Sequence, residues 1–70
     1  MKYDVYSTMS TKGKAVLETD DKSGKIISFV NADGETPELI QYSIDAGETL
    51  DQFLGSYRTL VVYPQGTRHD

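Results

Sequence analysis

No cysteine occurs in this chain of 70 residues, so neither a disulfide nor a thiolate-bound metal can hold the fold together. A chain of this length forms one domain, and it buries only about 60% of the surface that it exposes when unfolded. Its core must therefore be thin. Such domains depend on consistent local signals or on a partner subunit, so we expect self-association into a homo-oligomer more often than for an average domain.

The first half of the chain has the pattern of three β-strands. Their ranges are 2–9, 14–19 and 25–31. In the first, Tyr3, Val5 and Met9 share one face, as in a half-buried strand. The third is apolar on both faces, which predicts an interior strand. Turn residues separate the segments, so we expect consecutive strands to pair as a meander.

Residues 38–44 predict a fourth strand, because Ile40, Tyr42 and Ile44 alternate with polar residues. Residues 58–63 are a β-branched run that predicts a last, central strand, which Pro64 should end. We expect this last strand to lie beside an early one.

Residues 46–57 have the clearest helical period of the chain. At about 100° per residue, the apolar side chains gather on one side of the helix. They are Ala46, Leu50, Phe53, Leu54 and Tyr57. Asp45 followed by Glu48 resembles a capping box at the start of this helix.

Together these elements predict an α+β fold with a small, mainly antiparallel five-stranded sheet and one helix, in the order β-β-β-β-α-β. A small, partly open barrel plugged by the helix is the alternative. The domain should span residues 1–66, followed by a flexible tail over 67–70. The expected core residues are Val5, Leu17, Ile27, Phe29, Ile40, Ile44, Leu50, Phe53, Leu54, Leu60 and Val62.

The formal net charge is −4, and the acidic excess lies in the second half of the chain. Because nucleic-acid binding needs Lys and Arg to neutralise phosphates, this charge argues against a nucleic-acid partner. No apolar run reaches the roughly 18 residues of a membrane span, and the N-terminus lacks the apolar stretch of a signal peptide. We therefore expect a cytoplasmic protein without a membrane partner, and the start at Met1 suggests a complete small gene product.

Residues suited to catalysis or to metal binding are poorly placed. The one histidine, His69, precedes the last residue, and chain ends are too loosely held for a catalytic base. The acidic loops 20–24 and 31–35 lack the spacing of a calcium loop, and turn chemistry explains both. No glycine-rich phosphate motif occurs. We predict no enzymatic activity, no catalytic residues, no cofactor and no metal site.

A non-enzymatic protein-interaction module remains the leading hypothesis. The residues expected to contact the partner are Glu38, Asp45, Glu48, Asp51 and Tyr6. The carboxylates would face a basic protein, and Tyr6 is a tyrosine on the polar face of its strand. One version is a small acidic inhibitor of mobile-element (phage-like) type that mimics nucleic acid. The alternative is a small β-sheet protein that binds single-stranded nucleic acid through Tyr6 and neighbouring lysines. A small hydrolase is a third class, with no carboxylate to nominate.

Overall fold

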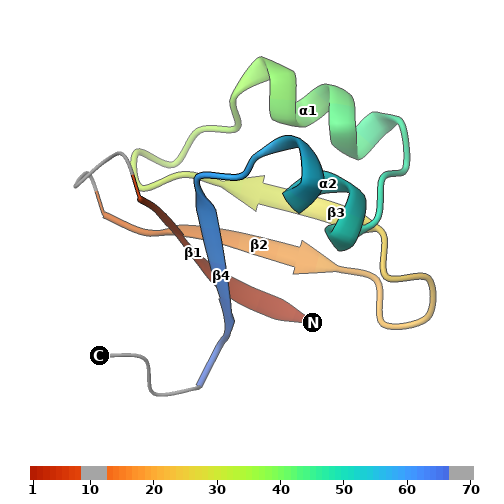
Figure 1. Cartoon of the computed structure of the whole chain (residues 1–70), viewed down its shortest axis with the longest axis horizontal. Helices are drawn as coiled ribbons and strands as arrows, with labels where there is room; N and C mark the ends of the chain where they lie inside the picture. The colour runs from red at the N-terminus through yellow and green to blue at the C-terminus, as the bar shows by residue number, and fades with distance from the viewer. Residues whose placement is uncertain (9–12, 67–70) are drawn as a thin grey trace.

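A computed structural model shows one antiparallel sheet and two helices, which confirms the α+β class (Figure 1). The structure describes residues 1–8 and 13–66, so Met9, the tail 67–70 and His69 lie outside it. The elements are β1 Lys2–Ser7, β2 Ala15–Thr19, β3 Ile26–Val30, α1 Glu38–Asp45, α2 Leu50–Ser56 and β4 Leu60–Pro64.

The sheet has four strands in the order β3-β2-β1-β4, where five strands were expected. Each neighbouring pair is antiparallel. The predicted meander of the first three strands is confirmed, and the last strand pairs with β1, as expected. The two edge strands, β3 and β4, do not pair with each other, so the sheet does not close into a complete barrel.

The prediction of a strand over residues 38–44 is wrong, because the segment forms helix α1. Pro37 precedes the helix with a φ of −57°, and proline suits a helix start because its φ is already fixed. Ile40 and Ser43 are buried, whereas Tyr42 is 64% exposed. A strand would place Ile40 and Tyr42 on one face, so this burial follows the period of a helix.

The predicted helix over 46–57 is too long, since α2 occupies only Leu50–Ser56. Its capping box is formed by Thr49 and Gln52, not by Asp45 and Glu48: Gln52 N donates to Thr49 Oγ1, and Thr49 N donates to Gln52 Oε1. Gly47 separates the two helices with a φ of +73°, a left-handed conformation that favours glycine. The chain therefore turns where one continuous helix was expected to begin.

The core lies between the sheet and the helices. Its buried apolar side chains are Val5, Ala15, Leu17, Ile26, Phe29, Ile40 and Phe53. The partly buried ones packed against them include Ile44, Leu50, Leu54, Leu60 and Val62. Most of the predicted core is confirmed.

Ile27 is the predicted core residue that the structure contradicts. It is 52% exposed, while Ile26 is 2% exposed. The pairing of β2 with β3 shifts register between Glu18 and Thr19, so that Ile27 is the extra residue on β3. Such a bulge reverses the alternation on one side of it, so the sequence pattern alone selects the wrong isoleucine.

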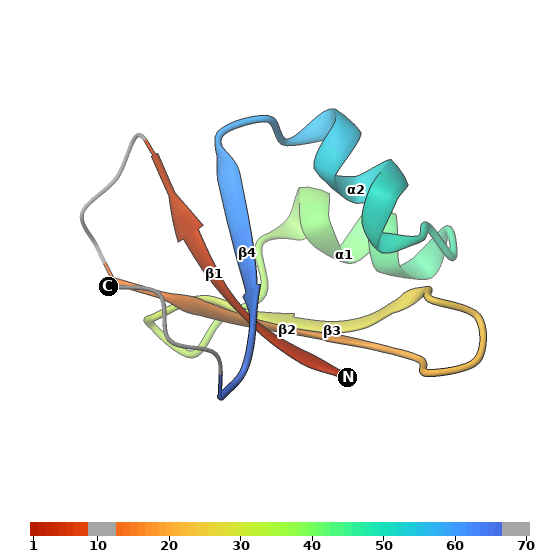
Figure 2. The same cartoon turned by 60° about the horizontal axis from the view of Figure 1, so that its bottom comes forward.

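Both helices lie on one side of the sheet and leave its other side without a helix (Figure 2). The segments expected inside the sheet, 25–31 and 58–63, instead supply its two edges, β3 and β4. Among the described residues, no helix combines the length and the apolarity that crossing a membrane would require.

Candidate functional site

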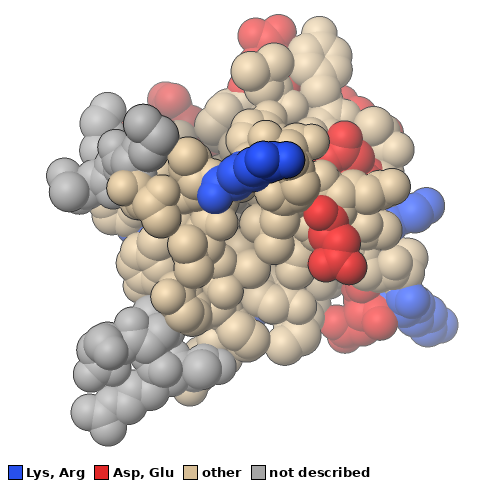
Figure 3. Space-filling view, viewed as in Figure 1, with Lys and Arg blue, Asp and Glu red and all other residues tan. Residues whose placement is uncertain are grey.

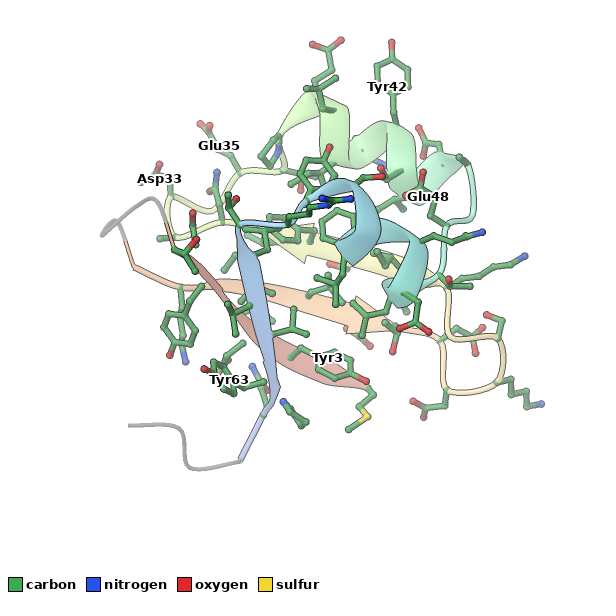
Figure 4. The ribbon with its side chains drawn as sticks, viewed as in Figure 1. Tyr3, Asp33, Glu35, Tyr42, Glu48 and Tyr63 are labelled. Atoms are coloured by element: carbon green, nitrogen blue, oxygen red, sulfur yellow. The ribbon has the colours of Figure 1, made fainter. Side chains whose placement is uncertain are left out.

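The outward side of α1 exposes the two most accessible large apolar side chains of the described chain. Leu39 is 70% exposed and Tyr42 is 64% exposed. Ile40 and Ser43 take the inward side of the same helix and are buried. Tyr42 projects from α1 away from the sheet (Figure 4). Side chains three residues apart lie one above the other on a helix, so Leu39 and Tyr42 form one continuous patch.

Two carboxylates flank this patch. Glu38 and Asp45 line a shallow hollow of about 170 Å³ together with Gln41 and Tyr42. Gln41 Nε2 donates to Asp45 Oδ1 at 3.0 Å, which holds the Asp45 carboxylate on the rim. The structure thus brings two of the predicted site residues, Glu38 and Asp45, onto one surface.

The backbone of Glu48 holds the connection between α1 and α2 against the sheet. Its backbone N–H donates to Ser43 O at 3.2 Å, and its carbonyl accepts from Ile26 N at 2.9 Å. These bonds tie the α1–α2 connection to the edge of β3. The Glu48 Oε1 atom is buried and has no hydrogen-bond partner among the described residues. The side chain of Lys25 lies beside Gly47, the residue that precedes Glu48. Glu48 is therefore a poor candidate for an exposed carboxylate.

Asp51 lies apart from the α1 patch, on the exposed side of α2. It stands in the first turn of that helix, where a negative charge stabilises the helix N-terminus. Its position is explained locally, without a partner.

Tyr6 lies on the helix-free side of the sheet. Its neighbour along the strand, Val5, points into the core, and side chains alternate along a strand. The Tyr6 and Tyr63 rings meet edge to face with centroids 5.9 Å apart. Asp4, on the same side, is only 6% exposed and pairs with Lys14 Nζ at 3.4 Å. The five predicted site residues thus occupy two sides of the molecule and do not form one site.

A second hollow, of about 240 Å³, opens between the sheet and the start of α1. Its floor is core: Val5, Ala15, Phe29 and Ile40 all line it. The loop residues Asn31 and Asp33 stand at its rim. Its lining is mostly apolar, and Ser7, Asn31 and Asp33 contribute the polar side chains. Within residues 1–8 and 13–66, no three His, Cys, Asp or Glu side chains come together as metal ligands.

Acidic and basic residues are unevenly distributed along the chain. No Lys or Arg occurs between Lys25 and Arg58. The same stretch contains six acidic residues, namely Asp33, Glu35, Glu38, Asp45, Glu48 and Asp51. The space-filling view shows the acidic side chains as separate groups and not as one dense patch (Figure 3). In Figure 4, Asp33 and Glu35 lie on the connection that leads to α1, at the left of the view, whereas Glu48 lies at the right.

Leu39, Gln41 and Tyr42 are the members of this surface that the sequence reasoning missed. The signal was present, since Ile40 and Ile44 are four residues apart and Pro37 stands three residues before Ile40. The same two isoleucines also fit a strand, and that interpretation placed Tyr42 on one face with them. Comparisons with protein-family models, with curated proteins and with solved structures find no match for the chain.

Proposed function

We propose that this chain is a non-enzymatic protein-interaction module that binds a basic protein partner through the outward side of α1. One observation carries the proposal: Leu39 and Tyr42 are largely exposed directly beside the carboxylates of Glu38 and Asp45. Aromatic and apolar side chains supply most of the binding energy in protein interfaces, and surrounding charges select the partner.

The segregation of charge supports a basic partner. The six acids between Lys25 and Arg58 give the helical side a negative field that no Lys or Arg of that stretch offsets. Such a field raises the association rate with a positively charged protein and weakens with salt. A small acidic inhibitor of mobile-element type, which occupies a nucleic-acid-binding surface in the cytoplasm, is the specific form of the proposal.

The test compares two variants that change the net charge equally. Glu38→Gln with Asp45→Asn removes both carboxylates of the α1 surface, and Asp20→Asn with Asp21→Asn removes two from the exposed β2–β3 loop. Wild type is immobilised, a captured host protein is identified and purified, and its affinity is measured at several salt concentrations. The first variant should lose at least tenfold in affinity, and the loop variant should bind like wild type. Equal affinity of all three proteins would refute the proposal.

The helix-free side of the sheet favours one second candidate, the binding of single-stranded nucleic acid. The Tyr6–Tyr63 pair lies there, and Lys14 engages Asp4 on the same side. Tyr6 and Tyr63 are both partly exposed, and aromatic rings on a sheet can stack bases, with lysines near the phosphates. A tyrosine fluorescence titration with short oligonucleotides at low salt tests this candidate. A saturable signal that Tyr6→Ala removes would support it, and an unchanged signal would exclude it.

A further inference from the structure

We propose that the outward side of α1 docks a cationic amphipathic helix of the partner; this inference rests on the proposed function and names the shape and charge of the contact. The apolar residues of that side are Leu39, Tyr42 and Ala46, at positions i, i+3 and i+7. At about 100° per residue they fall within roughly 60° of the helix circumference. This is the spacing with which two helices pack side by side.

The carboxylates form a second row parallel to the apolar one. Glu38 and Asp45 are seven residues apart, which places them within about 20° of each other and about 10 Å apart along the axis. Both lie on the Tyr42 side of the apolar row. A helix that carries an apolar row beside a basic row therefore matches α1 in both respects.

The hollow beside Tyr42 provides a place for a basic side chain. Glu38, Gln41, Tyr42 and Asp45 line it. Gln41 Nε2 already donates to Asp45, so the amide Oε1 of Gln41 is the acceptor that this side chain presents to a ligand. A lysine or arginine placed there would meet carboxylates and the tyrosine ring, which attracts cations over its face.

A second copy of this chain fits the same surface poorly. Two α1 helices packed against each other would bring Glu38 and Asp45 of one copy against the same carboxylates of the other. Like charges at such positions destabilise a helix pair. Nucleic acid is disfavoured for the same electrostatic reason. The charge of α1 therefore selects a positively charged occupant.

The probe for this inference is a synthetic helical peptide of about 18 residues that contains only Leu and Lys, arranged as one apolar and one basic row. A matched peptide replaces every Leu with Ser and keeps all lysines. Fluorescence anisotropy measures the binding of both peptides to the full chain. The Leu/Lys peptide should bind at least tenfold more tightly than the Ser/Lys peptide.

Two pairs of substitutions then locate the contact. Leu39→Ser with Tyr42→Ser should weaken binding of the Leu/Lys peptide at least tenfold. The control, Ile27→Ser with Val30→Ser, changes two exposed apolar residues of β3 and should leave the affinity unchanged. Circular dichroism melts establish that both variants fold, and backbone NMR shifts on adding the peptide should concentrate in residues 38–46.

The outcomes separate this inference from the function on which it rests. Equal binding of the two peptides, no binding, or equal losses for the Leu39/Tyr42 and Ile27/Val30 variants would overturn the helix-docking inference. If the captured partner still requires Glu38 and Asp45 in that case, the proposed function stands. If removing those carboxylates has no effect on the partner either, both fail.

Discussion

Phe53 connects the helical layer to the sheet through aromatic contacts. Its side chain is fully buried, with its ring centroid 5.9 Å from that of Phe29 on β3 and 4.7 Å from that of Tyr57. Aromatic pairs at these distances contribute beyond the area that they bury. In a core this small, one such side chain accounts for a large share of the packing.

Phe53→Ala should therefore lower the free energy of unfolding by about 3–5 kcal/mol, because it removes a buried ring and leaves a cavity. Leu54→Ala is the matched control: Leu54 is its neighbour on the same helix but only partly buried, so the loss should be smaller. Urea unfolding followed by circular dichroism measures both. A Phe53→Ala variant as stable as wild type would contradict the docking of α2.

Asp21 pairs with the N-terminal ammonium group of Met1, and this pairing lowers the pKa of the Asp21 carboxyl. The Met1 ammonium donates a hydrogen bond to Asp21 Oδ1 at 2.8 Å and adds an opposite charge, and both lower the pKa of Asp21 below 3.8. Since the folded-state pKa is the lower one, the pair stabilises the fold at pH values above 3.8, and this contribution is lost as the pH falls through the folded-state pKa.

The prediction is that an NMR titration finds the Asp21 carboxyl titrating below 3.8 and that acetylation of the N-terminus returns its midpoint toward that value. Both groups are largely exposed, so the accompanying change in stability should be small. A midpoint that acetylation leaves in place would show that the two groups do not pair in solution.

The start of α2 is capped by Thr49 and Gln52 and not by the expected pair, Asp45 and Glu48, and substitutions can test this difference. Thr49→Ala removes the side chain that accepts from Gln52 N and should cost about 1 kcal/mol of stability. Asp45→Ala removes the cap expected from sequence and an exposed hydrogen bond from Gln41 within α1, and it should have little effect on α2. Thermal melts of the two variants test the difference, and a larger loss for Asp45→Ala would favour the longer helix.

An element can be predicted from the sequence when its pattern of apolar residues fits only the period of a helix or only that of a strand. The strands β1 and β2 alternate between two faces, so their pairing and the meander are predictable. Ile40 and Ile44 satisfy both a strand and a helix, and the alternation that Tyr42 completes between them favoured the wrong one. The burial of Ser43 and the exposure of Tyr42 depend on what packs against α1, which no local pattern contains.

The edge positions of β3 and β4 were unpredictable for a related reason. Both strands are apolar on two faces, which normally indicates the interior of a sheet. For β3, the α1–α2 connection covers the edge, where Ile26 N donates to Glu48 O, and Thr36 Oγ1 donates to Phe29 O at 2.6 Å. An edge protected in this way tolerates an interior-like sequence.

Of the candidate site, the carboxylates were foreseeable from charge, but Leu39 and Tyr42 were not.

For the whole molecule, the layered fold turns a modest net charge into a charge difference between its two sides. Six of the eleven acidic residues lie between Lys25 and Arg58, while all seven basic residues lie outside that interval or at its ends. The stretch that contains both helices therefore has six acidic residues and no basic residue of its own, and Lys25 lies against Gly47 at the connection between the helices. The same field opposes contact between the helical sides of two copies, so any homo-oligomer should form through the sheet.

The exposed edge of β4 is where such self-association would occur. Gln65 N donates to Lys2 O, and backbone groups along a strand point alternately to its two neighbours. Residues 61, 63 and 65 therefore direct their backbone groups toward β1. The backbone groups of Leu60, Val62 and Pro64 point outward. Leu60 N already donates to Tyr57 O at 3.2 Å, and proline has no N–H. Of these three outward residues, Val62 alone offers an N–H to another strand. Proline at an edge limits pairing with a second sheet.

Pro64→Val should therefore increase self-association. It gives the edge a second outward N–H, two residues after that of Val62, and two β4 strands can then pair in antiparallel fashion. Sedimentation velocity over a range of concentrations measures the shift from monomer toward dimer. Adding Val62→Pro to the same protein removes the central donor again and should return it to the wild-type distribution. If Pro64→Val sediments like wild type at every concentration, the proline is not what keeps this edge unpaired, and the strand's twist or its side chains must do so instead.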